Sequence, residues 1–125
     1  MNTRKGPMSL ADQLLKRSTH SRFQVTAVIF DNRGIFAWGW NHAKQHAEIH
    51  AIKRSNRRRL LGATMIVLGR KKQSGNSLMT RPCPDCEKHI IAAGIAAVYH
   101  STYNPADPKT YNFTKLVPQL ATPRA

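Results

Sequence analysis

The chain has 125 residues, is 41% hydrophobic and carries a formal net charge of +14. That length and apolar content predict a single domain, residues 1–125, and exclude a disordered tail. No apolar run approaches the roughly 20 residues that span a bilayer, and the basic N-terminus lacks the apolar core of a secretory signal. We therefore expect no membrane partner.

The charge is unevenly distributed between acids and bases. There are 20 Lys and Arg against six Asp and Glu, and three of those acids (Glu48, Asp85 and Glu87) lie in or beside the two motifs described below. The remaining surface is then almost purely basic, which predicts an anionic partner such as a nucleotide or a nucleic acid. The run at 53–59 contains five Lys and Arg, more than are needed to complement the dipole at a helix C-terminus. The extra cations could bind phosphates, nucleic acid or an acidic patch on a neighbouring subunit.

The first third of the chain predicts a helix and a hairpin. Residues 1–7 have no pattern and are expected to be a loose end. Apolar side chains four residues apart predict an amphipathic helix over 9–18. The run FQVTAVIF at 23–30 predicts a buried strand, and the turn signal DNRG at 31–34 returns the chain into a second strand over 35–40.

The rest of the chain alternates helices with strands. The pattern predicts a helix from about 46 to 58, a strand at 63–69, a polar loop at 70–81, a helix at 83–93 and a strand at 95–100. Pro84 and Gly94 stand where the start and end of the second of these helices favour them. The tail predicts a short strand at 110–113, helical turns at 114–120 and a loose end at 121–125. This order predicts an α/β fold with a mixed sheet of four to five strands.

Two motifs carry the chemistry, and each opens a predicted helix. They are His46-Ala47-Glu48 and Pro82-Cys83-Pro84-Asp85-Cys86. The two cysteines share one face at a helix N-terminus, where the helix dipole favours the thiolate that binds metal. One histidine nitrogen and two sulfurs leave a fourth tetrahedral position for water, as in a catalytic zinc site. Glu48 would then be free to move the protons of that water.

The same residues also fit other kinds of site. His50 lies four residues after His46, so a closed Cys2His2 zinc site is an alternative, and so is a redox-active CxxC pair. Neither alternative gives Glu48 a role. A third alternative is a non-catalytic, basic nucleic-acid-binding module stabilised by zinc. The absence of further cysteines argues against a disulfide framework and favours a reducing compartment, the cytoplasm.

The two motifs together resemble the cytidine deaminase superfamily, which uses a site of this kind. The flanking Gly39-Trp40-Asn41 and the run TRPCPDCEKHIIAAGIAAVY at 80–99 are similar to deoxycytidylate deaminases and small phage deaminases. The resemblance covers roughly residues 23–103. It implies a three-layer α/β/α fold, one Zn²⁺ per chain and a homo-oligomer.

The resemblance also implies residue roles. It assigns His46, Cys83 and Cys86 to zinc and makes Glu48 the proton shuttle of a hydrolytic deaminase. It makes Asn41 a sugar contact, and it places backbone groups around Ala47, Pro82 and Cys83 near the leaving amine and the water. The implied reaction replaces the amino group at C4 of cytosine, or at C6 of adenine, and releases ammonia.

Further substrate contacts are hypotheses with ordinary alternatives. Trp40 either walls the pocket or packs in the core, Tyr103 either stacks on a base or packs on the sheet, and Arg81 either binds a phosphate or is solvated. We expect the substrate to be a free (deoxy)cytidine nucleotide such as dCMP, with the segment 70–72 as a further phosphate contact. Single-stranded DNA or RNA is the alternative. The expected surface or loop histidines are His20, His42, His89 and His100.

Overall fold

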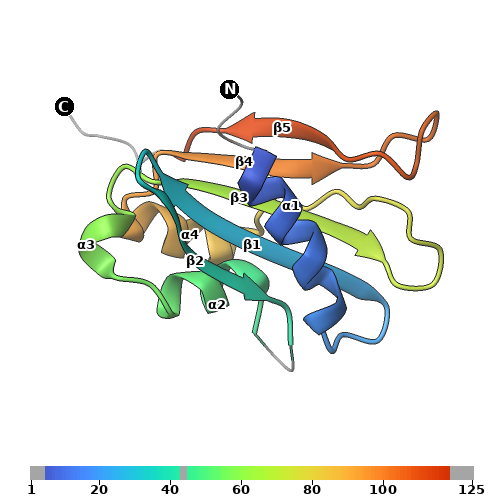
Figure 1. Ribbon diagram of the computed structural model, residues 1–125, viewed down its shortest axis with the longest axis horizontal. Coiled ribbons are helices and arrows are strands. Elements are labelled where there is room, and N and C mark those ends of the chain that lie inside the picture. The colour runs from blue at the N-terminus through green and yellow to red at the C-terminus, as the bar shows by residue number, and fades with distance from the viewer. Residues whose placement is uncertain (1–4, 43–44, 119–125) are drawn as a thin grey trace.

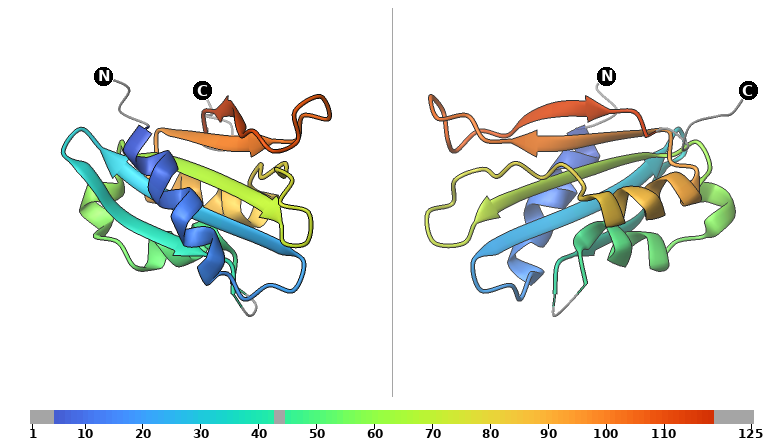
Figure 2. Two further views of the ribbon diagram at one scale, coloured as in Figure 1. Left: turned by 45° about the vertical axis from the view of Figure 1, so that its right-hand side comes forward. Right: turned by 180° about the vertical axis from the view of Figure 1, so that it is seen from behind.

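The computed structural model describes residues 5–42 and 45–118, which form one five-stranded sheet with helices on both faces (Figures 1 and 2). No helix in these ranges is long and apolar enough to cross a membrane. The elements are α1 (Lys5–Leu14), η1 (Leu15–Arg17), β1 (Phe23–Asp31), β2 (Gly34–Trp40), α2 (Ala47–Lys53), α3 (Arg57–Leu60), β3 (Thr64–Lys71), α4 (Pro84–Ala93), β4 (Ala97–Thr102) and β5 (Asn112–Leu116).

The strands lie in the order β2-β1-β3-β4-β5. β1 pairs antiparallel with both β2 and β3, β4 runs parallel to β3, and β5 returns antiparallel along β4. A parallel pair needs a crossover connection, and the segment containing α4 provides it between β3 and β4. The predicted mixed α/β sheet is confirmed, and it has the upper of the two predicted strand numbers.

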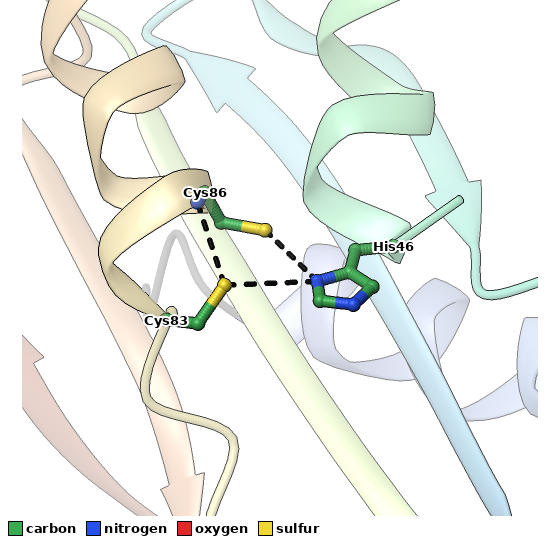
Figure 3. Close-up of side chains that lie close together, drawn as sticks. All are labelled: His46, Cys83 and Cys86. Atoms are coloured by element: carbon green, nitrogen blue, oxygen red, sulfur yellow. Dashed lines mark hydrogen bonds between the residues drawn. The ribbon is translucent and has the colours of Figure 1, made fainter. Parts of the chain in front are cut away.

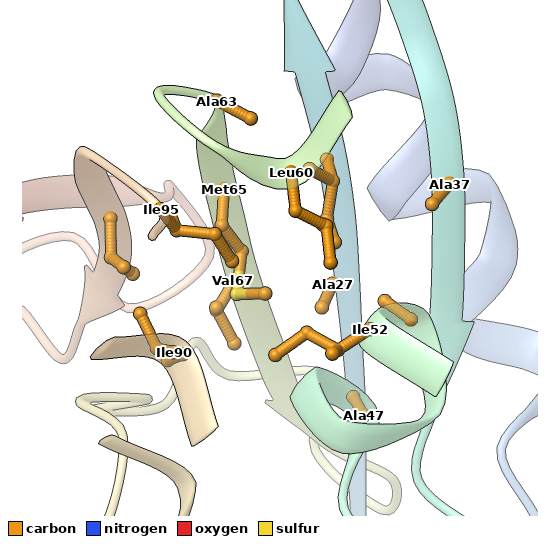
Figure 4. Packing of buried hydrophobic residues seen from close by; sticks show 13 residues of the cluster. Ala27, Ala37, Ala47, Ile52, Leu60, Ala63, Met65, Val67, Ile90 and Ile95 are labelled. Atoms are coloured by element: carbon orange, nitrogen blue, oxygen red, sulfur yellow. The ribbon is translucent and has the colours of Figure 1, made fainter. Parts of the chain in front are cut away.

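The larger core lies between the sheet and α2, α3 and α4 (Figure 4). Small side chains let α2 approach the sheet closely, since Ala47 and Ala51 are fully buried there. At Gly39 of β2, a Cβ atom would lie 2.6 Å from the backbone nitrogen of Ala51. The cluster consists of Ala27, Ile29, Ala37, Ala47, Ala51, Ile52, Leu60, Ala63, Met65, Val67, Ile90, Ile95 and Val98.

The opposite face is covered by α1 (Figure 2). Its smaller cluster consists of Ala11, Leu14, Leu15, Val28 and Leu68. The Thr26 hydroxyl donates a 2.7 Å hydrogen bond to the carbonyl of Ala11. This bond fixes α1 on β1 and satisfies a polar group that is buried there.

Helix boundaries differ from those predicted in two places. α1 begins at Lys5, so residues 5–7 are not a loose end; residues 1–4 and the expected loose end at 121–125 lie outside the described ranges. The helix predicted over 46–58 is two helices. Ser55 and Asn56 separate them, because such side chains compete with helical hydrogen bonding. The Ser55 hydroxyl donates to the carbonyl of Ile52, and the Asn56 side chain accepts from the N–H of Arg58 to cap α3.

The C-terminal tail also corrects the prediction. The short strand expected at 110–113 is β5, which begins at Asn112 and continues to Leu116. The helical turns predicted from 114 are therefore wrong at 114–116, and residues 119–120 lie outside the described ranges. Pairing with the edge of β4 makes this segment a strand. Five residues of β4, 98–102, pair with β5, and this pairing outweighs a weak local preference for helix.

Candidate metal centre and adjoining cavity

The two motifs meet where α2 and α4 begin. His46 is the N-cap residue of α2 and Cys83 is the N-cap residue of α4, and the two helices pack on the same face of the sheet. His46 Nδ1 lies 3.1 Å from Cys86 Sγ and 3.8 Å from Cys83 Sγ (Figure 3). The three ligand atoms lie within 4.8 Å of one another. Two sequence segments 37 residues apart thus supply one cluster of soft and borderline donors.

The geometry of this cluster fits a zinc ion. Tetrahedral zinc, with bonds of about 2.0–2.1 Å to nitrogen and about 2.3 Å to sulfur, places the two ligand atoms about 3.6 Å apart. The two observed nitrogen–sulfur distances, 3.1 and 3.8 Å, bracket that value. These contacts are hydrogen bonds in the structure (Figure 3), and the same three atoms converge closely enough to bind one cation. His46, Cys83 and Cys86 are therefore suited to hold one Zn²⁺.

The electrostatics of the site also favour a cation. Cys86 is fully buried, and burial is the main cause that raises the pKa of its thiol, with further increases from the nearby Glu48, Cys83 and Asp85. A coordinating metal ion reverses this tendency and deprotonates the thiol outright. The N–H of Cys86 also points at Cys83 Sγ, at 3.5 Å, as helix-start amides do towards an anion.

Glu48 is the acid that adjoins this cluster. It is the second residue of α2 and is only 6% exposed. Burial raises the pKa of its carboxyl group, while its own backbone N–H and the nearby His46 act in the opposite direction. A carboxyl group whose pKa is raised holds a proton more readily and can both accept and return one.

Glu48 opens into a cavity of about 520 Å³ at the end of the sheet. This volume lies within the range of small-molecule sites. The cavity brings together six of the ten residues predicted for the site, namely Asn41, His46, Ala47, Glu48, Arg81 and Cys83. Trp40, Pro82 and Tyr103 are not among the described lining residues, and Cys86 contributes through the metal cluster instead. The roles of all these residues towards a substrate stay predictions.

Asn41 is held in place by the protein itself. Its Oδ1 accepts hydrogen bonds from the N–H of Val25 and the hydroxyl of Ser18, and its Nδ2 donates to the carbonyl of Phe23 at 2.8 Å. These bonds tie the end of β2 to the start of β1. Among the described contacts this leaves one of the two N–H groups of the amide for a ligand, so Asn41 is both a structural anchor and a candidate donor.

His50 and Trp40 form a separate packing unit at the edge of the site. His50 Nδ1 accepts a 3.2 Å hydrogen bond from the N–H of Trp40, and the two rings meet edge to face with centroids 4.7 Å apart. The guanidinium groups of Arg17 and Arg54 each lie 5.4 Å from the Trp40 ring centroid. Within the described ranges the metal-ligand cluster does not include His50. The geometry therefore favours an open three-residue site over a closed Cys2His2 site.

Several cavity residues were not singled out from the sequence. His20 and His42, expected only on the surface or in loops, line the cavity because the segments before β1 and after β2 converge at one end of the sheet. The available signal was position alone: His20 lies just before β1, and His42 lies four residues before His46. The other additional lining residues are Phe23, Val25, Gln45, Leu78, Met79 and Thr80.

Comparison with known proteins also indicates a zinc site in this chain. Residues 1–102 match the family model described as the cytidine and deoxycytidylate deaminase zinc-binding region. No curated protein matches the sequence significantly. Among solved structures, the dCMP deaminase from the cyanophage S-TIM5 in complex with dCMP and dUMP is 25% identical, with a TM-score of 0.61 and coverage of 84% of this chain and 85% of that one.

Two further structures show the breadth of this fold. The cytidine deaminase from Burkholderia pseudomallei is 19% identical, with a TM-score of 0.61 and coverage of 87% of both chains. RibD from Acinetobacter baumannii is 23% identical, with a TM-score of 0.60 and coverage of 87% of this chain. This chain spans only 30% of that RibD chain. The family match over most of the sequence shows that the chain belongs to the cytidine and deoxycytidylate deaminase family, and the cluster of His46, Cys83 and Cys86 fits the zinc-binding region of that family.

Proposed function

We propose that the chain hydrolyses the amino group of cytosine in a (deoxy)cytidine nucleotide, of which dCMP is the simplest example, and releases ammonia. One observation carries this proposal. The buried carboxyl group of Glu48 opens into the same cavity as His46 and Cys83, and a cation, Arg81, stands on the wall of that cavity. The similarity to a cyanophage dCMP deaminase supports the nucleotide as the substrate class.

The reaction exchanges one bond for another at C4 of the base. The C4–O bond forms from water, the C4–N bond breaks, and uracil and ammonia are the products. Zinc, when bound by His46, Cys83 and Cys86, supplies a Lewis acid that lowers the pKa of water. The Glu48 carboxylate accepts one proton of the attacking water and delivers it to ring N3. It then accepts the remaining proton from the new C4 hydroxyl and delivers it to the departing amino group, which leaves as ammonia. Its raised pKa suits both transfers.

The cavity walls match a pyrimidine nucleotide. Phe23, Val25, Leu78 and Met79 provide an apolar surface for the flat ring, and burial in an apolar site excludes bulk water. Polar groups from Asn41 and Gln45 are available for the sugar and the base edge. The guanidinium of Arg81 is suited to a phosphate, which it can bind through two parallel hydrogen bonds.

A substrate panel tests this proposal. Purified protein of known zinc content is incubated with deoxycytidine, cytidine, dCMP, CMP and dAMP, and product is followed by absorbance and mass. We expect conversion of the cytosine compounds, with dCMP or CMP preferred over the nucleosides. Zinc-loaded protein that converts none of them would support the non-catalytic binding module instead, and conversion of dAMP alone would reassign the base.

Glu48→Gln is the matched control for that panel. The amide keeps the size and most hydrogen bonds of the buried side chain but cannot shuttle protons. We expect activity to fall by about 10²–10⁴-fold or more, with zinc content and melting temperature retained. A Glu48→Gln protein that keeps its activity would remove Glu48 from the reaction.

Localisation and assembly follow as further parts of the proposal. Cys83 and Cys86 are free thiols, and they must stay reduced to hold a metal ion, so we place the protein in a reducing compartment such as the cytoplasm. We also propose a homo-oligomer, which size-exclusion chromatography with light scattering would measure directly.

A further inference from the structure

A second hollow of about 650 Å³ adjoins the catalytic cavity. Phe23 lines both spaces and forms the ridge between them. None of the hollow's lining residues is acidic and three are cationic. They are Ser21, Arg22, Phe23, Lys71, Lys72, Gln73, Ser74 and Asn76.

Backbone pairing builds this hollow at the active-site end of the sheet. Phe23 at the start of β1 pairs with Lys71 at the end of β3, and the N–H of Lys72 donates a 2.8 Å hydrogen bond to the carbonyl of Arg22. The turn beyond β3 is closed by 2.8 Å bonds from Lys71 N–H to the carbonyl of Asn76 and from Gly75 N–H to the carbonyl of Lys71. Figure 1 shows this turn beside the turn that precedes β1. The cations are therefore held on ordered backbone.

The charges of the hollow are not neutralised by the protein. Across residues 5–42 and 45–118, the one ion pair within 4 Å joins Arg59 to Asp31, and it lies elsewhere. The ammonium group of Lys109 adds a further cation at the rim, where it donates to the carbonyl of Ser74. Gathering cations without acids costs repulsion, which a bound anion relieves.

The ridge between the two spaces is aromatic and partly exposed. Phe23 is 38% exposed, and the ring of His20 stacks on it with centroids 5.6 Å apart and an interplanar angle of 26°. The guanidinium of Arg22 lies 6.0 Å from the Phe23 ring centroid. A flat aromatic surface flanked by cations suits a nucleotide that passes from one space into the other.

We propose that this hollow binds a phosphate of the substrate beyond the one attached directly to the nucleoside in the catalytic cavity. The inference rests on the proposed function and deepens it, because it extends the substrate past dCMP. Arg22, Lys71 and Lys72 supply the charge, and the side chains of Ser21, Gln73 and Asn76 supply neutral hydrogen-bond donors. The phosphate has two chemical sources: the terminal phosphates of a nucleoside triphosphate, or the phosphodiester of the next nucleotide in a single strand.

Paired charge-removal variants test the site. Lys71→Gln with Lys72→Gln removes two charges from the hollow. Arg57→Gln with Arg58→Gln removes two charges from α3, which precedes the opposite end of β3. Values of kcat/KM are measured for dCMP, dCTP and a trinucleotide with one central cytosine. We expect the first pair to reduce the preference for an extended substrate over dCMP about tenfold, the effect of losing one charge-assisted hydrogen bond. The control pair should change that preference less than twofold.

The pattern across substrates identifies the source of the phosphate. A preference for dCTP that the Lys71 and Lys72 substitutions abolish assigns the hollow to a triphosphate, and the same result for the trinucleotide assigns it to a strand. Either result supports the proposal. Equal losses in the two variant pairs, or no gain from any added phosphate in the unmodified protein, would overturn it.

A binding measurement keeps the inference independent of catalysis. A fluorescein-labelled single-stranded oligonucleotide containing deoxyuridine is titrated with protein at several salt concentrations. Removing the contact to one phosphate should make the slope of log K against log salt shallower by about 0.7 for a single strand, while the control pair leaves it unchanged. Failure of every deamination assay with this slope change intact would reject the proposed function and retain the anion site. An equal change of slope in the two variant pairs would show that the hollow does not bind a phosphate of single-stranded nucleic acid.

Discussion

The two faces of the sheet are built for different tasks. The face under α2, α3 and α4 combines the larger apolar cluster with buried polar groups, among them Glu48 and His100. On the face under α1, the buried hydroxyl of Thr26 donates a hydrogen bond to the carbonyl of Ala11 in α1 and serves only packing. Two helices on the first face, α2 and α4, start at the metal cluster, whereas α1 on the other face does not (Figures 1 and 3). Chemistry and packing are thereby divided between the faces, so substitutions should separate them.

The largest expected effect comes from removing the metal ligands on the site face. Cys83→Ala with Cys86→Ala should reduce zinc from one ion per chain to none and abolish deamination, because a single histidine nitrogen cannot retain the ion. Metal analysis by mass spectrometry measures this directly. His50→Ala is the matched control and should keep zinc. A His50→Ala protein without zinc would favour the closed Cys2His2 site.

Packing on the α1 face should affect stability alone. Leu14 is buried against the sheet in the smaller cluster, and Leu14→Ala should lower the free energy of unfolding by about 2–5 kcal/mol through lost burial and a residual cavity. Denaturant unfolding measures the loss. Below the melting temperature, zinc content and kcat should stay near those of the unmodified protein. A parallel loss of zinc would show that the two faces are coupled.

Gly39 should connect packing to the site. An added Cβ would lie 2.6 Å from the nitrogen of Ala51 and 2.7 Å from the carbonyl oxygen of Ala47, both backbone atoms of α2. Gly39→Ala must therefore shift the helix that begins beside His46, at a cost of about 1–3 kcal/mol. We expect weaker zinc retention in a chelator titration, unlike Leu14→Ala. Gly6→Ala on α1 is the control, because the added Cβ would meet nothing within 4 Å apart from the neighbouring backbone of its own helix.

The smallest expected effect concerns pH. His100 is 2% exposed, neither ring nitrogen has a hydrogen-bond partner among the described residues, and burial lowers the pKa of its imidazole. The unfolded chain then binds a proton that the folded chain does not. Stability is complete above the unfolded pKa of about 6.5 and declines as pH falls below it, by at most about 1.4 kcal/mol per pH unit.

His100→Leu removes that dependence while keeping an apolar side chain in the core. Between pH 7 and pH 5 its free energy of unfolding should fall less steeply than that of the unmodified protein. His89→Gln, on the exposed surface of α4, should keep the original slope. Identical slopes for His100→Leu and the unmodified protein would mean that His100 is not the titrating group.

Local sequence determined the elements and the metal ligands. Alternating and periodic apolar residues placed β1, β2, β3, α4 and β4 within a few residues, and Pro84 and Gly94 bounded α4 at both ends. His46, Cys83, Cys86 and Glu48 could be identified because their chemistry depends on residue type and on spacing within one helical turn. Residue type and spacing within one helical turn are local properties, so they can be read directly from the sequence.

Tertiary structure alone decided the environment of those residues. Pairing with β4 set β5, and side-chain bonds at Ser55 and Asn56 divided the helix after His46. Asn41 became an anchor through partners 16 to 23 residues away, and Phe23 became the ridge between two hollows because β1 starts where β3 ends. Contacts between residues far apart in the chain depend on the packing of the whole sheet, which local patterns do not specify.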